Sequence, residues 1–89
     1  MIETLGDIAQ MARNPKQGRT PGDNTFNCTW AAVALDAYTK VVGGDDNEVG
    51  TQISDLLGDL MHLADAAGVD FYAELSSAET NYEAEVSGE

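Results

Sequence analysis

The chain has 89 residues, which fits one domain near the lower size limit for a self-sufficient hydrophobic core. Hydrophobic residues make up 43% and charged residues 22%, a composition that excludes a disordered acidic tail. The formal net charge of -12 excludes direct binding to nucleic acid or to an anionic membrane. With one cysteine and no apolar stretch near the ~20 residues of a membrane span, we predict a cytoplasmic protein without disulfides.

The first segment predicts a short helix followed by a basic loop. Residues 4–14 place apolar side chains at three- and four-residue spacing, and Thr4 is a suitable N-cap. Residues 14–24 contain both prolines and many other turn formers, which predicts a loop. Three of the four basic residues of the chain lie in or beside this loop. We expect it to contact the acidic face of the same chain or of a second subunit.

Three longer helices are predicted after the loop, separated by glycine turns. The second helix begins at its N-cap Asn24 and ends at Gly43-Gly44. The third follows the acidic run 45–48, which the helix dipole favours at an N-terminus, and ends at Gly68. The fourth is capped by Asp70 and frays into an acidic tail over residues 84–89.

The apolar stripes of these helices define the expected core. On the second helix the stripe comprises Phe26, Trp30, Val33, Ala34, Ala37 and Val41. On the third it comprises Val49, Ile53, Leu56, Leu57, Leu60, Leu63, Ala64 and Ala67, and on the fourth Phe71, Leu75, Ala78 and Tyr82. The stripes make Phe26, Trp30, Phe71 and Tyr82 the expected aromatic core anchors, whereas Tyr38 and Tyr72 lie off them.

No run of β-branched residues alternates with polar ones, so no strand is predicted. We predict an all-α fold: a small antiparallel helical bundle of three main helices plus a short N-terminal helix, forming a single domain over residues 1–89. Large core side chains are few. Pairing of two copies through the third or fourth helix would bury apolar area that a lone bundle leaves exposed, so we expect a homodimer.

Negative charge is concentrated in the second half of the chain. Between Val41 and Glu89 there are twelve Asp or Glu residues and no Lys or Arg. Such a surface attracts a basic protein and repels nucleic acid and anionic membranes. The partner-binding residues that we predict are Asp55, Asp59, Asp65, Asp70, Glu74 and Tyr72.

Helical spacing places Asp55, Asp59 and His62 on one face of the third helix. Carboxylates in this arrangement could hold Mg²⁺, which accepts one or two carboxylates together with water and substrate phosphates. The alternative is a solvated polar face opposite the leucine stripe. No complete catalytic motif or cofactor-binding loop is present in the sequence.

The stretch from Ser54 to Phe71, continuing to Tyr82-Glu83, combines a leucine-rich helix, a Gly-Val-Asp corner and a closing helix. Over about residues 53–83 it resembles the helical hairpin in the second half of the MazG-like all-α nucleoside triphosphate pyrophosphohydrolases. The same stretch also resembles small uncharacterised bacteriophage proteins. The second resemblance implies a phage-type protein that acts in the cytoplasm of its host cell.

The metal-binding motif of the pyrophosphohydrolases is degenerate in this chain. In that family a Glu-x-x-Asp pair precedes the corner, and Asp59 stands at the position of its Asp. Leu56 stands where the family has the metal-binding Glu, and Asp36 is the one carboxylate of the preceding helix. The resemblance therefore implies an incomplete site, in which Asp55 and Asp59 would be the Mg²⁺ ligands.

Three functions are compatible with these patterns, and the third is an oligomeric accessory or structural protein whose acidity serves only solubility. The first is a small acidic, non-enzymatic binding protein, a DNA-mimic-like inhibitor of the anti-CRISPR type, that engages a basic nucleic-acid-handling partner of the host. The alternative is a degenerate MazG-like, Mg²⁺-dependent nucleoside triphosphate pyrophosphohydrolase. The sparse carboxylate motif favours the binding protein over the enzyme.

Overall fold

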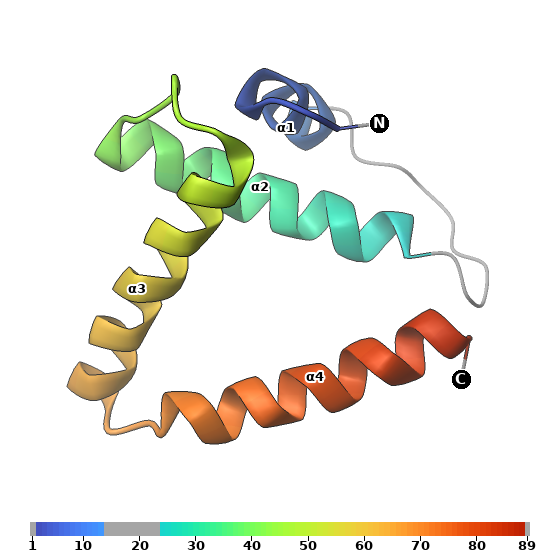
Figure 1. The fold of residues 1–89 in the computed structure, drawn as a ribbon, viewed down its shortest axis with the longest axis vertical. Helices are drawn as coiled ribbons and strands as arrows, with labels where there is room; N and C mark the ends of the chain where they lie inside the picture. Colours follow the sequence, from blue (N-terminus) through green and yellow to red (C-terminus); the bar gives the residue numbers. More distant parts are fainter. Residues whose placement is uncertain (1, 14–23, 89) are drawn as a thin grey trace.

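The computed structural model describes residues 2–13 and 24–88, which form four α-helices (Figure 1). These are α1 (Leu5–Arg13), α2 (Thr25–Val42), α3 (Val49–Ala67) and α4 (Phe71–Ser87). Both described ranges are without β-strands, so the predicted all-α fold is confirmed. Apart from Asn24, the predicted basic loop lies outside the described residues. Across the same two ranges, no helix is long and apolar enough to cross a membrane.

Reciprocal hydrogen bonds begin α1. The backbone N–H of Asp7 donates to Thr4 Oγ1 over 3.1 Å, which confirms Thr4 as the N-cap. The N–H groups of Glu3 and Thr4 donate back to Asp7 Oδ2 over 2.9 and 3.1 Å. Both bonds stabilise the charged carboxylate and so lower the pKa of Asp7, and the bond from Glu3 has the larger effect. The arrangement is a capping box that satisfies the free N–H groups of the first turn.

The corner between α3 and α4 is formed by the predicted residues. Gly68 adopts the left-handed conformation with φ of 72°, where a residue with a Cβ atom is strained. The N–H of Val69 donates to the carbonyl of Ala64 over 2.9 Å and closes the end of α3. Asp70 Oδ1 then accepts the N–H of Ala73 over 3.2 Å and caps α4.

The hydrophobic core lies between α1 and α2. Its buried members are Leu5, Ile8, Ala32 and Leu35. Half-buried side chains pack around it, including Val49 and Leu56 from α3. The well-packed part of the molecule is therefore the pair of N-terminal helices, joined by the first turns of α3.

Gln52 attaches the start of α3 to the end of α2. Its side chain is 1% exposed, and its Nε2 donates to Thr39 Oγ1 and to the carbonyl of Gly43, both over 3.1 Å. Its Oε1 accepts from Asn47 Nδ2 over 3.1 Å. A buried amide is stabilising only when its donors and acceptors are satisfied. Here its three hydrogen bonds connect α3 to α2 and to the turn between the two helices.

The predicted core stripe of α2 is wrong. Trp30 is 56% exposed and Val41 is 84% exposed, whereas Thr29, Ala32 and Leu35 are the buried residues of the helix. Ala32 and Leu35 pack with Leu5 and Ile8 of α1, on the side of α2 away from the predicted stripe. The physical reason is that α2 is apolar on both sides, so its periodicity is compatible with either side packing against α1.

Two expectations for the aromatic residues are corrected as well. Tyr38 packs against the core cluster although it lies off the predicted stripe. Tyr82 is exposed and Phe71 is only half-buried, so neither anchors a core. None of the 17 residues of α4 is buried. The apolar stripe of α4 therefore faces solvent in the single chain.

The helical bundle is open. Figure 1 shows α3 leaving the end of α2 and α4 turning back, so that these helices form three sides of a triangle with α1 beside α2. The triangle closes where Asn27 Nδ2 donates to Glu85 Oε2 over 2.5 Å. Helix α4 continues to Ser87, and Gly88 caps it with φ of 83°, so the helix extends past the predicted start of fraying. The hydrogen bond from Asn27 to Glu85 ties this last turn to α2.

Candidate functional site

A groove separates the C-terminal end of α2 from α3. Its walls are formed by Tyr38, Val42, Gly43, Gly44, Asn47, Gln52, Ser54, Asp55, Gly58, Asp59 and His62. We call it the α2–α3 groove. The structure thus brings the three predicted polar residues of α3, Asp55, Asp59 and His62, to one wall of a hollow. All three side chains are exposed, so a partner can reach them.

Tyr38 connects the two walls of the α2–α3 groove. Its hydroxyl group donates a hydrogen bond to Asp59 Oδ2 over 2.5 Å. This hydrogen bond, with partial burial and the negative charges of Asp59 and Asp55, raises the pKa of Tyr38 to about 12. The phenol therefore stays protonated, and its bond to Asp59 sets the orientation of that carboxylate.

Three carboxylates of α3, those of Asp55 and Asp59 in the groove and that of Asp65 beyond it, have no ion-pair partner in the described part of the chain. No Lys, Arg or His side chain of residues 2–13 and 24–88 forms an ion pair with Asp55, Asp59 or Asp65. The negative charge of this wall is thus not neutralised by those residues. A wall of this kind attracts positively charged groups electrostatically.

The described residues contain no group of three or more His, Cys, Asp or Glu side chains placed to hold a metal ion. Asp36, the third carboxylate that a Mg²⁺ site would need, lines a different hollow and pairs with Lys40 over 2.9 Å. Within this single chain, Asp55 and Asp59 are therefore not joined by Asp36. Sequence spacing could not show this, because it does not define the direction in which Asp36 leaves α2.

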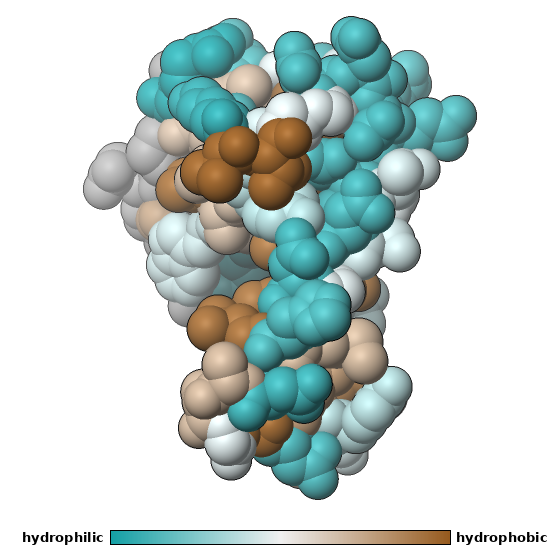
Figure 2. Space-filling view, turned by 90° about the vertical axis from the view of Figure 1, so that its left-hand side faces the viewer, coloured by the Kyte–Doolittle hydropathy of each residue, from teal (hydrophilic) through white to brown (hydrophobic). Residues whose placement is uncertain are grey.

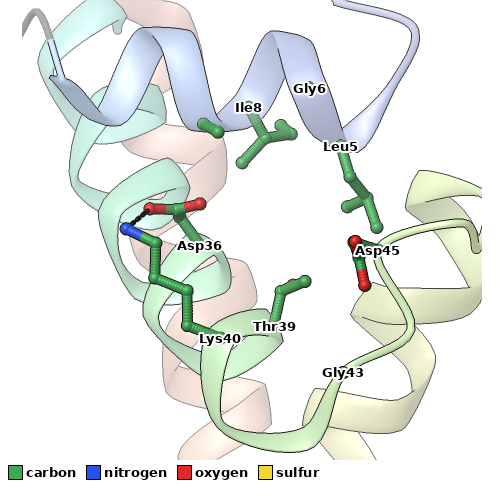
Figure 3. Close-up of a pocket in the computed structure, with 9 residues that line it drawn as sticks. Leu5, Gly6, Ile8, Asp36, Thr39, Lys40, Gly43 and Asp45 are labelled. Carbon is green, nitrogen blue, oxygen red and sulfur yellow. Dashed lines mark ion pairs between the residues drawn. The ribbon is translucent and has the colours of Figure 1, made fainter.

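The second hollow lies between α1 and the end of α2 (Figure 3). Leu5 and Ile8 point into it from α1, and Asp36 and Lys40 form an ion pair on α2. This hollow differs from the α2–α3 groove because the carboxylate of Asp36 already has a cationic partner. Its apolar wall also belongs to the core. We therefore regard the α2–α3 groove as the candidate site.

The remaining predicted partner-binding residues lie near the corner of α3 and α4. Asp70 is occupied as the cap of α4, and Glu74 is exposed one turn later. Tyr72 is exposed and meets the ring of Phe71 edge to face, with centroids 5.8 Å apart. A helical rise of about 1.5 Å per residue separates Asp59 from the end of α3 at Ala67, where this corner begins, by roughly 12 Å. The predicted residues thus form two groups, with Asp65 between them on α3.

Polar residues dominate the side of the molecule that α3 forms. Figure 2, which views that side, shows a nearly continuous hydrophilic band from top to bottom with hydrophobic residues on both sides of it. Exposed apolar side chains of α3 include Ile53, Leu57, Leu60 and Leu63. Acidic and apolar surfaces are therefore adjacent on this helix.

Fold and groove together define a small all-α protein with an acidic hollow between its second and third helices. No family model, curated protein or solved structure matches the chain. The resemblances of residues 53–83 to the pyrophosphohydrolases and to phage proteins stay predictions.

Proposed function

We propose that this chain is a non-enzymatic acidic binding protein that engages a basic, nucleic-acid-handling protein through the α2–α3 groove and the adjoining face of α3. The partner would offer Lys and Arg side chains that otherwise bind phosphate groups, as in a host defence or nucleic-acid enzyme. The single observation behind the proposal is the charge distribution: twelve Asp or Glu residues and no Lys or Arg after Lys40. A domain that needed charge only for solubility would intersperse both signs.

The groove geometry supports the proposal in a second way. Asp55, Asp59 and Asp65 lie on one helix, and a rise of about 1.5 Å per residue spreads their carboxylates over roughly 15 Å. Negative charges spread over this length of one helix would imitate a short run of backbone phosphates. Because Tyr38 holds the carboxylate of Asp59, one of these charges is already ordered before a partner binds.

A charge-matched pair of variants tests the proposal. The groove variant combines Asp55→Asn, Asp59→Asn and Asp65→Asn. The control combines Asp45→Asn, Asp46→Asn and Glu48→Gln, which are exposed residues of the turn before α3. Both variants lose three negative charges, so a difference between them reports position and not net charge.

The measurement is capture of partners from a bacterial lysate at low and high salt, followed by competition with duplex DNA. We expect the wild-type chain to retain a basic protein that salt or DNA releases, because screening and phosphate both compete with the carboxylates. The groove variant should retain several-fold less of it and the control about as much as the wild type. Equal losses in both variants, or a partner that DNA does not displace, would refute the groove as a phosphate-like surface.

The enzyme alternative makes a different prediction. A Mg²⁺-dependent pyrophosphohydrolase would release pyrophosphate from nucleoside triphosphates, and Asp59→Ala would abolish this release. Asp55 and Asp59 would then be the Mg²⁺ ligands of an incomplete site. An activity of this kind, together with no salt-sensitive partner, would replace the binding proposal with the enzyme.

A further inference from the structure

Helix α2 exposes a long apolar stripe on the side that faces away from α1. We call it the α2 stripe, and it comprises Phe26, Trp30, Val33, Ala34, Ala37 and Val41. Trp30, Val33 and Val41 are exposed large hydrophobic residues, both alanines are exposed as well, and Phe26 is half-buried. A contiguous apolar surface of this length is unusual on a protein that works alone in water and marks an interaction site.

The α2 stripe contains no charged residue. The charged side chains of the helix, Asp36 and Lys40, pair with each other over 2.9 Å, and Asp36 lines the hollow next to α1. This is notable in a chain with a net charge of -12. A basic partner would find no carboxylate within the stripe, so the surface that complements it is equally apolar and uncharged. The stripe of a second copy meets that description.

The exposed area of the chain is large enough for such a contact. The chain exposes 6362 Å², whereas a compact protein of 9.4 kDa exposes about 5,000 Å². The excess of roughly 1,300 Å² is more than the ~800 Å² that each partner buries in a standard interface. The radius of gyration, 14.2 Å, likewise exceeds the ~12 Å of a compact chain of this length.

We propose that two copies of this chain pair through their α2 stripes in a two-fold symmetric dimer. Two-fold pairing brings the same surface of each copy together and is the commonest symmetry of homo-oligomers. The contact buries Trp30 and Val33 from both chains without placing carboxylates opposite one another. None of the six stripe residues lines the α2–α3 groove, so the contact is compatible with a partner in that groove. The contact therefore lies on α2, whereas the sequence predicts it on the third or fourth helix.

The apolar stripe of α4 is a poorer surface for a second copy. Leu75, Tyr82 and Val86 are exposed there, but Glu79 lies four residues after Leu75 and three before Tyr82, so it shares their face of the helix. Pairing of two such stripes would bring these carboxylates together. Like charges in a contact oppose association, so the uncharged α2 stripe is favoured.

Sedimentation equilibrium over a range of concentrations tests the proposal. We expect the wild-type chain to approach twice 9.4 kDa at micromolar concentration. Val33→Glu should raise the dissociation constant of the dimer by more than about tenfold, because it places two carboxylates in an apolar contact. The matched control is Val86→Glu, the same substitution at an exposed valine of α4, which should leave the dimer unchanged.

Two further measurements keep the test independent of folding defects. Circular dichroism shows whether Val33→Glu is still helical, and Val41→Glu supplies a second variant at a position that is 84% exposed. The single tryptophan should shift its emission to shorter wavelength as the wild-type dimer forms. A wild-type chain that stays monomeric at about 0.1 mM, or equal weakening by Val86→Glu, would overturn the proposal.

Salt distinguishes this dimer from the proposed binding function. Screening weakens the repulsion between two chains of net charge -12, so salt should strengthen the dimer. The same salt should weaken capture of a basic partner by the α2–α3 groove. Failure of one proposal therefore leaves the other measurable.

Discussion

The pair α1–α2 and the hairpin α3–α4 use their apolar residues in different ways. Between α1 and α2, Leu5, Ile8 and Leu35 are buried in one cluster. Along α3 and α4, nine large apolar side chains are exposed, and α4 has no buried residue. The difference shows that one half of this small chain supplies the stability of the fold, whereas the other half mainly supplies surface.

The largest difference between the two halves is expected for a core truncation. Leu35→Ala, at a position 4% exposed, should lower the free energy of unfolding by about 2–5 kcal/mol, because it leaves a cavity between α1 and α2. Leu63→Ala, at a position 63% exposed on α3, should change it by less than about 0.5 kcal/mol. Chemical denaturation of both variants measures this. A larger loss for Leu63→Ala would place the core in the hairpin.

The connection between the two halves depends on Gln52. Replacing it with alanine removes three hydrogen bonds and leaves the carbonyl of Gly43 without this donor. We expect a loss of about 1–3 kcal/mol in the free energy of unfolding. Thr51→Ala, at the exposed preceding position, is the control and should be nearly neutral. If both variants had the same stability, the buried amide would not be what joins α3 to α2.

Two glycines of the hairpin should respond with opposite signs. Gly68→Ala forces a Cβ atom into the left-handed conformation at the end of α3 and should cost about 1 kcal/mol. Gly58→Ala lies inside α3, where an added Cβ meets nothing within 4 Å, and should stabilise the chain by about 0.5–1 kcal/mol. Thermal unfolding of the two variants provides the comparison. A stabilising Gly68→Ala would argue against the corner described here.

The smallest effect concerns the hydrogen bond of Tyr38 to Asp59 and is visible in its pH dependence. The pKa of Tyr38 is raised from 10.0 to about 12, so the folded state holds the phenolic proton more tightly than the unfolded state. Its contribution to stability is therefore complete below pH 10 and is lost as the pH rises towards 12. Tyr38→Phe should be less stable than the wild type below pH 10, and this difference should shrink above it. Denaturant unfolding at several pH values tests this, and a constant difference would contradict the assignment.

Local signals in the sequence predict several helix ends, although Asn24 precedes α2 without a side-chain cap hydrogen bond and α4 extends beyond the predicted start of fraying. Thr4, Gly68 and Asp70 act through their own backbone neighbours, so their roles as caps and stops follow from residue type and spacing. The all-α fold follows from the same signals. Each of these features involves residues only a few positions apart, which is the range over which a sequence pattern is informative.

Long-range packing could not be predicted in the same way. The side of α2 that faces α1 depends on which of two apolar surfaces fits Leu5 and Ile8, and the helical period of α2 does not distinguish them. The hydrogen bond between Tyr38 and Asp59 joins residues 21 positions apart and depends on the direction in which α3 leaves α2. Helical spacing predicted that Asp55 and Asp59 share a face of α3, but it did not predict the groove that this face lines.

The central claim is that the α2–α3 groove is a recognition surface for basic groups. Titration of an arginine-rich peptide into the ¹⁵N-labelled protein tests it residue by residue. We predict chemical-shift changes centred on Tyr38, Asp55, Asp59 and His62 that fade with added salt, with little change in α1. Equal shifts at every acidic residue of the chain, or none in the groove, would contradict the claim.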